Sequence, residues 1–254
     1  MAKIIAVANQ KGGVGKTTTT VNLVACLAEL GKKVLMIDTD PQGNATSGFS
    51  INKVEQEKTI YELLIGECAV NDCIIKDVMP NVSVMPANVN LAAAEIELIG
   101  IKDKEFILKN ELEYIEDQYD YILIDCPPAL NTLTLNAMTT ASSIIVPIQC
   151  EYLALEGLSD LVTTINLVKE RLNPSLDLEG IVFTMYDSRT ILSQDVVENV
   201  TSHFPNKTYE TKIPRNVRLS EAPSFGKPVI AYDSKSAGAE SYRSLAKEVV
   251  KRSK

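Results

Sequence analysis

Residues 10–18 read Gln-Lys-Gly-Gly-Val-Gly-Lys-Thr-Thr, and this glycine-rich stretch decides what kind of fold to expect. Its glycines allow the backbone to turn N–H groups onto phosphate oxygens, and Lys16 is placed to reach the β- and γ-phosphates. Thr17 can offer its hydroxyl to Mg²⁺. The ordinary motif has a glycine where this chain has Gln10, and beside it stands an additional lysine, Lys11. The stretch therefore predicts nucleotide binding and leaves Lys11 to be explained.

The composition is typical of a soluble globular protein. The chain has 254 residues, of which 45% are hydrophobic and 23% charged, and no apolar run approaches the length of a membrane helix. No basic-then-apolar leader precedes the first strand pattern. The five cysteines are an odd number without Cys-x-x-Cys spacing, so we expect buried free thiols rather than disulfides or metal ligands. These features predict a reduced, cytoplasmic protein.

The charge is unevenly distributed along the chain. The net charge of −8 would argue against nucleic-acid binding if it were evenly spread. Residues 189–254, however, hold 12 Lys and Arg against 7 Asp and Glu, a net of +5, whereas residues 1–188 hold 13 against 26, a net of −13. This asymmetry leaves room for a polyanion-binding face on an acidic protein. Basic residues that merely solvate terminal helices explain it equally well.

Apolar runs separated by helical patterns predict a three-layer α/β domain with a mostly parallel central sheet. The expected strands are 4–8, 34–37, 121–124 and 143–148, with weaker candidates at 82–85 and 178–185. The expected helices are 18–30, 59–65, 89–98, 103–117, 131–140, 155–172 and 190–203. No linker or internal repeat divides the chain, so we expect a single domain over residues 1–254.

Three aspartates follow the predicted strands, where such sheets place their ligands. Asp125 closes the run 121–124, and a carboxylate there can hold Mg²⁺ through water opposite Thr17. Asp38 and Asp40 lie two residues apart at another strand end and therefore point the same way. One can face the metal shell while the other positions an attacking water. A plain Asp-Pro turn after a strand is the structural alternative.

Four segments together resemble the ParA/Soj chromosome- and plasmid-partitioning ATPases. This family belongs to the deviant Walker A class of P-loop ATPases, which also contains the MinD division-site proteins and nitrogenase iron proteins. The segments are 11–18, 38–44, Asp125-Cys126-Pro127-Pro128, and Ile-Pro-Arg-Asn-Val-Arg-Leu-Ser-Glu-Ala-Pro at 213–223. The resemblance covers nearly the whole chain. It implies a three-layer αβα P-loop NTPase fold and Mg²⁺-dependent hydrolysis of ATP to ADP and phosphate.

The resemblance implies a catalytic role for four residues. Lys11 matches the signature lysine that reaches the partner's phosphates across a nucleotide-sandwich dimer, as an arginine finger does in trans. Lys16 matches the P-loop lysine, and Asp125 matches the carboxylate of the second Walker motif. Asp40 matches the residue that positions the hydrolytic water. Gly12 lies where a side chain would crowd the partner, so Lys11 and Gly12 are also the expected dimerisation residues.

The resemblance also implies the cofactor contacts. Thr17 matches a direct Mg²⁺ ligand, and Asp38 and Asp125 match positions that hold the metal through water. Pro214 and Asn216 match the loop around the adenine. The full expected ATP-binding set is Lys11, Gly12, Gly13, Val14, Gly15, Lys16, Thr17, Thr18, Pro214 and Asn216.

In this family only the ATP-bound dimer binds DNA, without sequence preference. Arg189 and Arg218 match positions implicated in that binding, and both lie where the charge balance turns basic. The alternative is that each arginine pairs with a surface carboxylate. The resemblance further implies stimulation by a ParB-type centromere-binding protein, association with the nucleoid in the ATP state, and no membrane contact. Because no extension precedes the first strand, we expect DNA binding to reside in the ATPase domain itself.

Four alternatives remain open at this point. A MinD-like protein would end in a membrane-binding amphipathic helix, but the apolar face of residues 242–250 has no Phe or Trp and stops before the basic end. A nitrogenase-type subunit would need two cluster-bridging cysteines, and none of the five matches such a context. A non-hydrolysing scaffold would not need Asp40. A metabolic transferase on the same fold is made unlikely by the segment 213–223.

Overall fold

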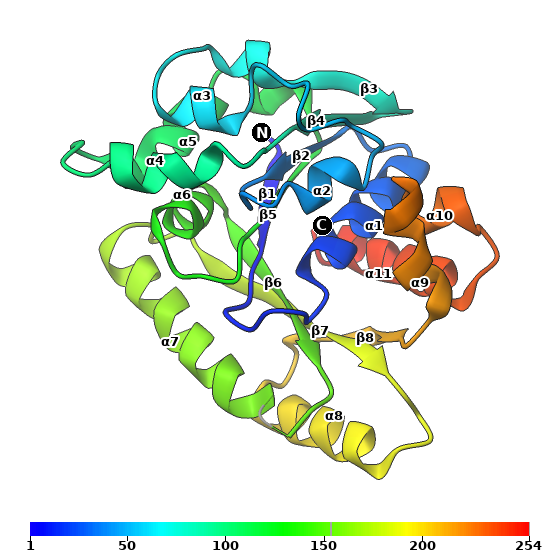
Figure 1. Ribbon diagram of the computed structural model, residues 1–254. Coiled ribbons are helices and arrows are strands. Elements are labelled where there is room, and N and C mark those ends of the chain that lie inside the picture. Colours follow the sequence, from blue (N-terminus) through cyan, green and yellow to red (C-terminus); the bar gives the residue numbers. More distant parts are fainter. Residues whose placement is uncertain (153, 254) are drawn as a thin grey trace.

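The structure is a computed structural model that describes residues 1–152 and 154–253, and a single eight-stranded sheet runs through those residues (Figure 1). The strands are β1 (Lys3–Val7), β2 (Val34–Asp38), β3 (Ile75–Met79), β4 (Val82–Met85), β5 (Tyr121–Asp125), β6 (Ser143–Gln149), β7 (Asp177–Tyr186) and β8 (Thr208–Pro214). Their order across the sheet is β3-β4-β2-β5-β1-β6-β7-β8, and only the β3–β4 pair is antiparallel. The predicted fold class is confirmed.

Helices cover both faces of the sheet. They are α1 (Lys16–Glu29), α2 (Asn44–Ser47), α3 (Ile60–Leu64), α4 (Leu91–Glu97), α5 (Ile107–Leu112), α6 (Thr132–Thr140), α7 (Ala154–Arg171), α8 (Ile191–His203), α9 (Val217–Glu221), α10 (Val229–Tyr232) and α11 (Ala237–Arg252). Short 3-10 turns occupy η1 (Val70–Cys73), η2 (Lys104–Phe106), η3 (Glu116–Gln118) and η4 (Ala222–Phe225).

The alternation of side chains along each strand builds two cores. In β1, Ile4 and Ala6 face the helices α3 to α8, whereas Ile5 and Val7 face α1, α2 and α9 to α11. Figure 1 shows these two helical layers on opposite sides of the sheet. Both faces of the central strands are buried, which explains why the sequence shows continuous apolar runs there rather than alternation.

The predicted helix over 103–117 is wrong as a single element. It is divided into η2, α5 and η3, and side chains of α6 take up the backbone groups at the break. Asn136 accepts a hydrogen bond from the Leu108 amide at 3.1 Å and donates to the Lys104 carbonyl at 2.9 Å. Because these bonds replace helical ones, the local periodicity did not reveal the break.

Strand β8 was not predicted. Its sequence, Thr-Tyr-Glu-Thr-Lys-Ile-Pro, mixes polar and apolar residues because β8 lies at the edge of the sheet and is buried only in part. The pattern is that of a half-solvated strand and is easily taken for a loop. Its place matters for function, because residues 213–223 continue directly from it.

The carboxyl-terminal helix α11 is docked on the core, as expected. Tyr242, Leu245 and Val249 are buried against α1 and β8, and their side chains belong to the core of that layer. In the described residues, no helix is long and apolar enough to cross a membrane. The apolar face of α11 is therefore occupied by the protein itself, which removes the feature on which a MinD-like membrane helix would depend.

Candidate nucleotide site

The phosphate loop, residues 9–15, connects β1 to α1 at the carboxyl edge of the sheet. Gly13 and Gly15 have φ angles of +75° and +89°, a left-handed backbone that favours glycine. The hydroxyl of Thr184 on β7 lies 2.8 Å from the Val14 carbonyl oxygen, and the Lys11 amide donates to the Asn9 side chain at 2.9 Å. Neighbouring strands thus hold the loop in shape, with its amides at the amino end of α1, where anions bind.

Lys16 folds back over this loop. Its side chain is only 7% exposed, and its ammonium group donates to the Lys11 carbonyl oxygen at 3.1 Å. Burial lowers the pKa of Lys16, and the nearby charges of Asp125 and Asp40 oppose that shift. A cation held in this position is pre-oriented for phosphate oxygens at the same loop.

Two carboxylates lie side by side behind the loop. Asp38 and Asp125 are opposite one another in the parallel pairing of β2 with β5, and both are fully buried. The carboxylate of Asp125 accepts hydrogen bonds from Thr17 at 2.8 Å and from Thr20 at 2.7 Å. Burial raises the pKa of Asp125, and the charge of Asp38 raises it further. Burial also raises the pKa of Asp38, although hydrogen bonds from Thr46 oppose that shift.

This arrangement fits a magnesium ion. The donors are carboxylate and hydroxyl oxygens, which hard cations prefer, and two carboxylates buried side by side are a place where a cation can compensate negative charge. Among the described residues, no cluster of three or more Asp, Glu, His or Cys side chains forms a metal cage. Mg²⁺ keeps several waters and takes further ligands from substrate phosphates. The site therefore brings together Thr17, Asp38 and Asp125.

Asp40 lies on the switch loop, residues 39–43, between β2 and α2. Its amide donates to Asp38 at 3.1 Å, and its own Oδ1 accepts from the Gln42 amide at 2.9 Å. The residue is half-buried, unlike the two carboxylates behind it. Asp40 is thus next to the predicted metal site and accessible from the side where a nucleotide would lie.

Lys11 has a partner that the sequence did not predict. Its ammonium group forms an ion pair with Glu151, which follows β6, and both side chains are a little over 40% exposed. Lys11 therefore has a place within one chain. A Cβ atom on the adjacent Gly12 would meet nothing within 4 Å in residues 1–152 and 154–253, so a side chain at this position has space there.

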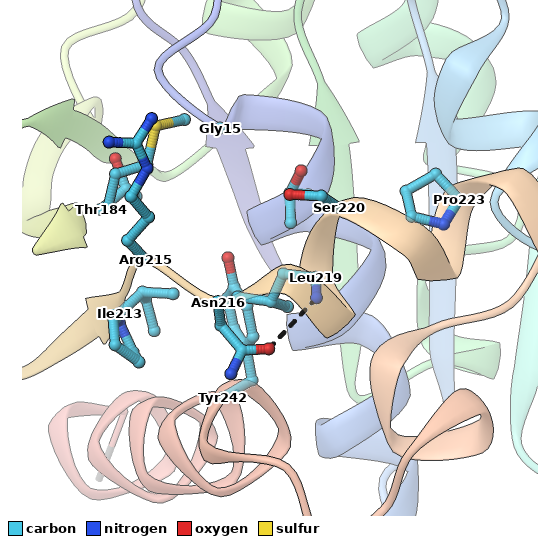
Figure 2. A pocket seen from close by; sticks show the side chains of 12 residues that line it. Gly15, Thr184, Ile213, Arg215, Asn216, Leu219, Ser220, Pro223 and Tyr242 are labelled. Carbon is cyan, nitrogen blue, oxygen red and sulfur yellow. Dashed lines mark hydrogen bonds between the residues drawn. The ribbon is translucent and has the colours of Figure 1, made fainter.

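A cavity of about 380 Å³ opens beside the amino end of α1 (Figure 2). Its lining comes from the phosphate loop, α1, β7, the segment 213–223 and α11. The predicted adenine residues Pro214 and Asn216 both line it, together with Gly15 and Thr18. Asn216 also caps α9, because its Oδ1 accepts from the amides of residues 218 and 219 at 3.0 and 3.3 Å.

Three residues of this cavity lie outside every motif segment that the sequence singled out. Thr184 and Met185 come from β7, and Tyr242 comes from α11, where its hydroxyl lies 3.2 Å from that of Thr19. Met185 has a φ of +51°, an uncommon value for a non-glycine residue and one often found at functional sites. No local motif marks these positions. They reach the cavity only because β7 and α11 pack beside α1.

The two predicted DNA-binding arginines are paired with carboxylates within the chain. Arg189 is 86% exposed and bonds Asp187 through Nη2 at 2.7 Å. Arg218 is 46% exposed and contacts Glu221 at 2.8 Å and Asp233 at 3.2 Å. The alternative noted from the sequence, pairing with surface carboxylates, therefore describes both side chains. Exposed pairs of this kind are weak and leave a guanidinium able to exchange partners.

A protein-family model described as an AAA domain matches residues 2–178. The chain is 55% identical over 249 residues to the sporulation initiation inhibitor protein Soj of Bacillus subtilis, and the match covers 98% of each chain. It is 50% identical over 252 residues to the chromosome partitioning protein ParA of Caulobacter vibrioides, covering 98% of this chain and 94% of ParA.

Among solved structures, the chain superposes with a TM-score of 0.87 on cobyrinic acid a,c-diamide synthase from Mycobacterium smegmatis with bound ADP and magnesium. The two sequences are 36% identical, and the match covers 99% of this chain and 95% of that one. The same protein with a bound ATP analog and magnesium gives the same TM-score. Identity is thus considerably higher to the partitioning proteins than to this synthase.

Proposed function

The chain belongs to the ParA/Soj family of chromosome-partitioning ATPases and is a Mg²⁺-dependent ATPase, and we propose that its nucleotide state controls dimerisation and DNA binding. The observation that carries this proposal is the bond between Thr17 and Asp125, with Asp38 alongside and Lys16 across the loop. The positions of these groups within one chain support a phosphate and metal site. We propose that residues 1–254 act as one ATPase domain.

Phosphate binding would fall to the amino end of α1. The amides of residues 12–18 and the ammonium of Lys16 bind the phosphate oxygens, with Lys16 exchanging the Lys11 carbonyl for the β- and γ-phosphates. Mg²⁺, when bound, neutralises charge on the β- and γ-phosphate oxygens. The adenine would occupy the cavity at Pro214 and Asn216, with Nδ2 of Asn216 as a donor to the base.

Asp40 is the residue we assign to the attacking water. Among the described residues, its Oδ2 accepts no hydrogen bond, whereas Oδ1 is oriented by the Gln42 amide. An oriented carboxylate beside the phosphate site can hold a water in line with the γ-phosphate. A pure nucleotide binder has no need of such a group.

Lys11 would act on a second copy of the chain. A Cβ atom on Gly12 would meet none of the described residues within 4 Å, which leaves space for a partner on that side of the loop, and Lys11 there would add positive charge to the transferring phosphoryl group. To reach across, Lys11 must leave Glu151. Glu151 therefore holds Lys11 in the single chain, and closure of the ATP dimer releases it.

The ATP-bound homodimer would then bind DNA without sequence preference through a surface that includes Arg189 and Arg218. Both guanidinium groups are exposed enough to exchange carboxylates for DNA phosphates. Hydrolysis, stimulated by a ParB-type centromere-binding protein, would reopen the dimer and release DNA. In a cell this places the protein in the cytoplasm, on the nucleoid while ATP is bound, and away from membranes.

Gel retardation over a salt series tests the proposal. Wild-type protein should retard DNA only with ATP and Mg²⁺, and its affinity should fall steeply as salt rises, because phosphate contacts release counterions. Asp40→Ala should bind ATP, fail to hydrolyse it, and remain on DNA. Asp117→Ala, at an exposed carboxylate outside the site, is the matched control.

Two results would count against the proposal. Retardation that does not depend on nucleotide would separate DNA binding from the ATPase cycle. Normal turnover by Asp40→Ala would show that Asp40 does not position the attacking water. That result would not contradict ATP binding.

A further inference from the structure

Thr46 connects three parts of the site that are distant in the sequence. It lies in α2 and is fully buried. Its backbone amide donates to Oδ2 of Asp38 at 2.8 Å, and its hydroxyl donates to the same oxygen at 2.7 Å. The hydroxyl also accepts a hydrogen bond at 2.9 Å from the Ala87 amide, just beyond β4. One side chain therefore joins α2 to the sheet at two places.

The carboxylate of Asp38 completes the connection. Its second oxygen accepts the Asp40 amide at 3.1 Å, so the two oxygens bind Asp40 in the switch loop and Thr46 in the helix that follows it. At the end of that loop, Gly43 has a φ of +62°, and a Cβ there would lie 2.7 Å from the Ala87 carbonyl oxygen. The loop is thus closed into a small ring and packed against the residue that Thr46 binds.

We propose that Thr46 is a positioning residue for ATP hydrolysis, which acts through Asp38 to hold the switch loop with Asp40 at the γ-phosphate. This inference rests on the role of Asp40 proposed above. Thr46 itself touches neither substrate nor metal. It has no counterpart among the motif residues that the sequence singled out.

The geometry explains why the hydroxyl matters. Hydrogen bonds to a charged, buried carboxylate are stronger than neutral ones, and Asp38 receives two of them from this one residue. Without the hydroxyl, Asp38 keeps the backbone bonds from Thr46 and Asp40, and the Ala87 amide is left buried without its acceptor. The phosphate loop and Lys16 do not depend on Thr46. Its loss should therefore disturb the water-positioning loop and leave ATP binding in place.

The test compares Thr46→Val, which keeps the shape and removes the hydroxyl, with Thr46→Ser, which keeps the hydroxyl. Thr46→Val should lower kcat for ATP by at least about 10-fold and change KM by less than about twofold, whereas Thr46→Ser should stay within about threefold of wild type. Thr139→Val is the matched control, because its buried hydroxyl bonds backbone oxygens in α6 and η2. Thr46→Ala, which also lacks the hydroxyl, replaces Thr46→Val if the latter does not fold.

Hydrogen exchange supplies a second readout. In Thr46→Val, the amides of residues 40–46 should exchange at least about 10-fold faster than in wild type, whereas those of residues 12–18 should not change. An unchanged kcat in Thr46→Val would overturn the proposal. So would a Thr46→Ser variant as impaired as Thr46→Val, because the hydroxyl would then not be the group that acts.

Asp40→Ala, measured in parallel, distinguishes a failure of the role proposed for Thr46 from a failure of the role proposed for Asp40. If Asp40→Ala is inactive and Thr46→Val is fully active, only the role of Thr46 is wrong. If Asp40→Ala hydrolyses ATP normally, the assignment of Asp40 fails and the inference about Thr46 fails with it.

Discussion

The two ends of the nucleotide site are built in opposite ways. At the phosphate end, Lys16, Asp38 and Asp125 are buried, and short hydrogen bonds hold each in one orientation. At the other end, beyond the adenine cavity, Arg189 and Arg218 are exposed and held by ion pairs with neighbouring carboxylates. The first end is pre-organised for a single ligand geometry. The second can exchange its partners.

Burial is the physical reason for this difference. A hydrogen bond to a buried charge is strong and costly to lose, whereas an exposed ion pair is screened by water and salt. We therefore expect substitutions at the phosphate end to change nucleotide binding and stability strongly. Substitutions at the arginine end should be almost silent until a polyanion is present.

The largest effect is expected for Lys16→Ala. Removing the ammonium that lies over the phosphate loop should weaken ATP binding by at least about 100-fold, which corresponds to about 3 kcal/mol, because a desolvated charge–phosphate contact is lost. Calorimetric titration with ATP and Mg²⁺ measures this. The exposed Lys33→Ala variant is the control and should bind as wild type. Comparable affinities for the two variants would contradict a pre-organised phosphate end.

Asp125→Asn tests how much the two buried, neighbouring carboxylates at the phosphate end lower the stability of the folded protein. Because burial raises the pKa of Asp38 and Asp125, the folded protein binds protons more tightly than the unfolded chain, so stability falls as pH rises above the ordinary carboxyl range near 4. The ligand-free wild type should therefore melt lower at about pH 8 than at about pH 5. Asp125→Asn should gain about 1–2 kcal/mol at the higher pH and lose most of this dependence.

Thermal melts with and without Mg²⁺ and ATP complete that experiment. Mg²⁺ and ATP should stabilise the wild type more than Asp125→Asn, which lacks one of the charges that hold the metal. If the ligand-free wild type is equally stable at both pH values, the pKa values of Asp38 and Asp125 are not raised in the folded protein.

Gly12→Val tests the side of the phosphate loop that we expect to face a second copy of the chain. A Cβ atom at this position meets nothing within 4 Å among the described residues, so stability and ATP affinity should change little. A bulky group facing the partner should, however, prevent the ATP-dependent dimer, as measured by light scattering with ATP and Mg²⁺. A dimer of normal stability in this variant would mean that residues 11 and 12 do not face a second copy.

The smallest effect on the free protein is expected for Arg218→Ala. Loss of its exposed pairs with Glu221 and Asp233 should leave the melting temperature and ATP affinity nearly unchanged. DNA affinity of the ATP state should fall by about 10-fold, with a salt dependence weaker by about one ion. Arg171→Ala, at an exposed arginine on α7, is the control. Equal DNA affinity of both variants would exclude Arg218 from the DNA surface.

Most of the fold and the phosphate end were predictable from the sequence. Buried strands such as β2 and β5 are marked by continuous apolar runs, and Asp38 and Asp125 stand at their ends. The adenine cavity was predictable only in part. Pro214 and Asn216 belong to a recognisable segment, whereas Thr184, Met185 and Tyr242 reach the cavity from β7 and α11 without any local signal.

The division at residues 103–117 and the edge strand β8 show why prediction stopped where it did. In both cases the decisive partners are far along the chain, such as Asn136 for the break in the helix and β7 for the edge strand. A periodic pattern reports only which side of an element is buried. It does not report which distant group satisfies the backbone.

The sequence by itself determined the chemistry of the phosphate loop, because glycines at left-handed positions, a lysine and a threonine act through local geometry. It also determined the class of fold, because continuous apolar runs indicate strands that are buried on both faces of a sheet. Only the tertiary structure decided how the charges are held. Lys11 pairs with Glu151, and Thr46 binds Asp38, across 140 and 8 residues of chain. Such contacts depend on which elements pack together, and no local pattern encodes them.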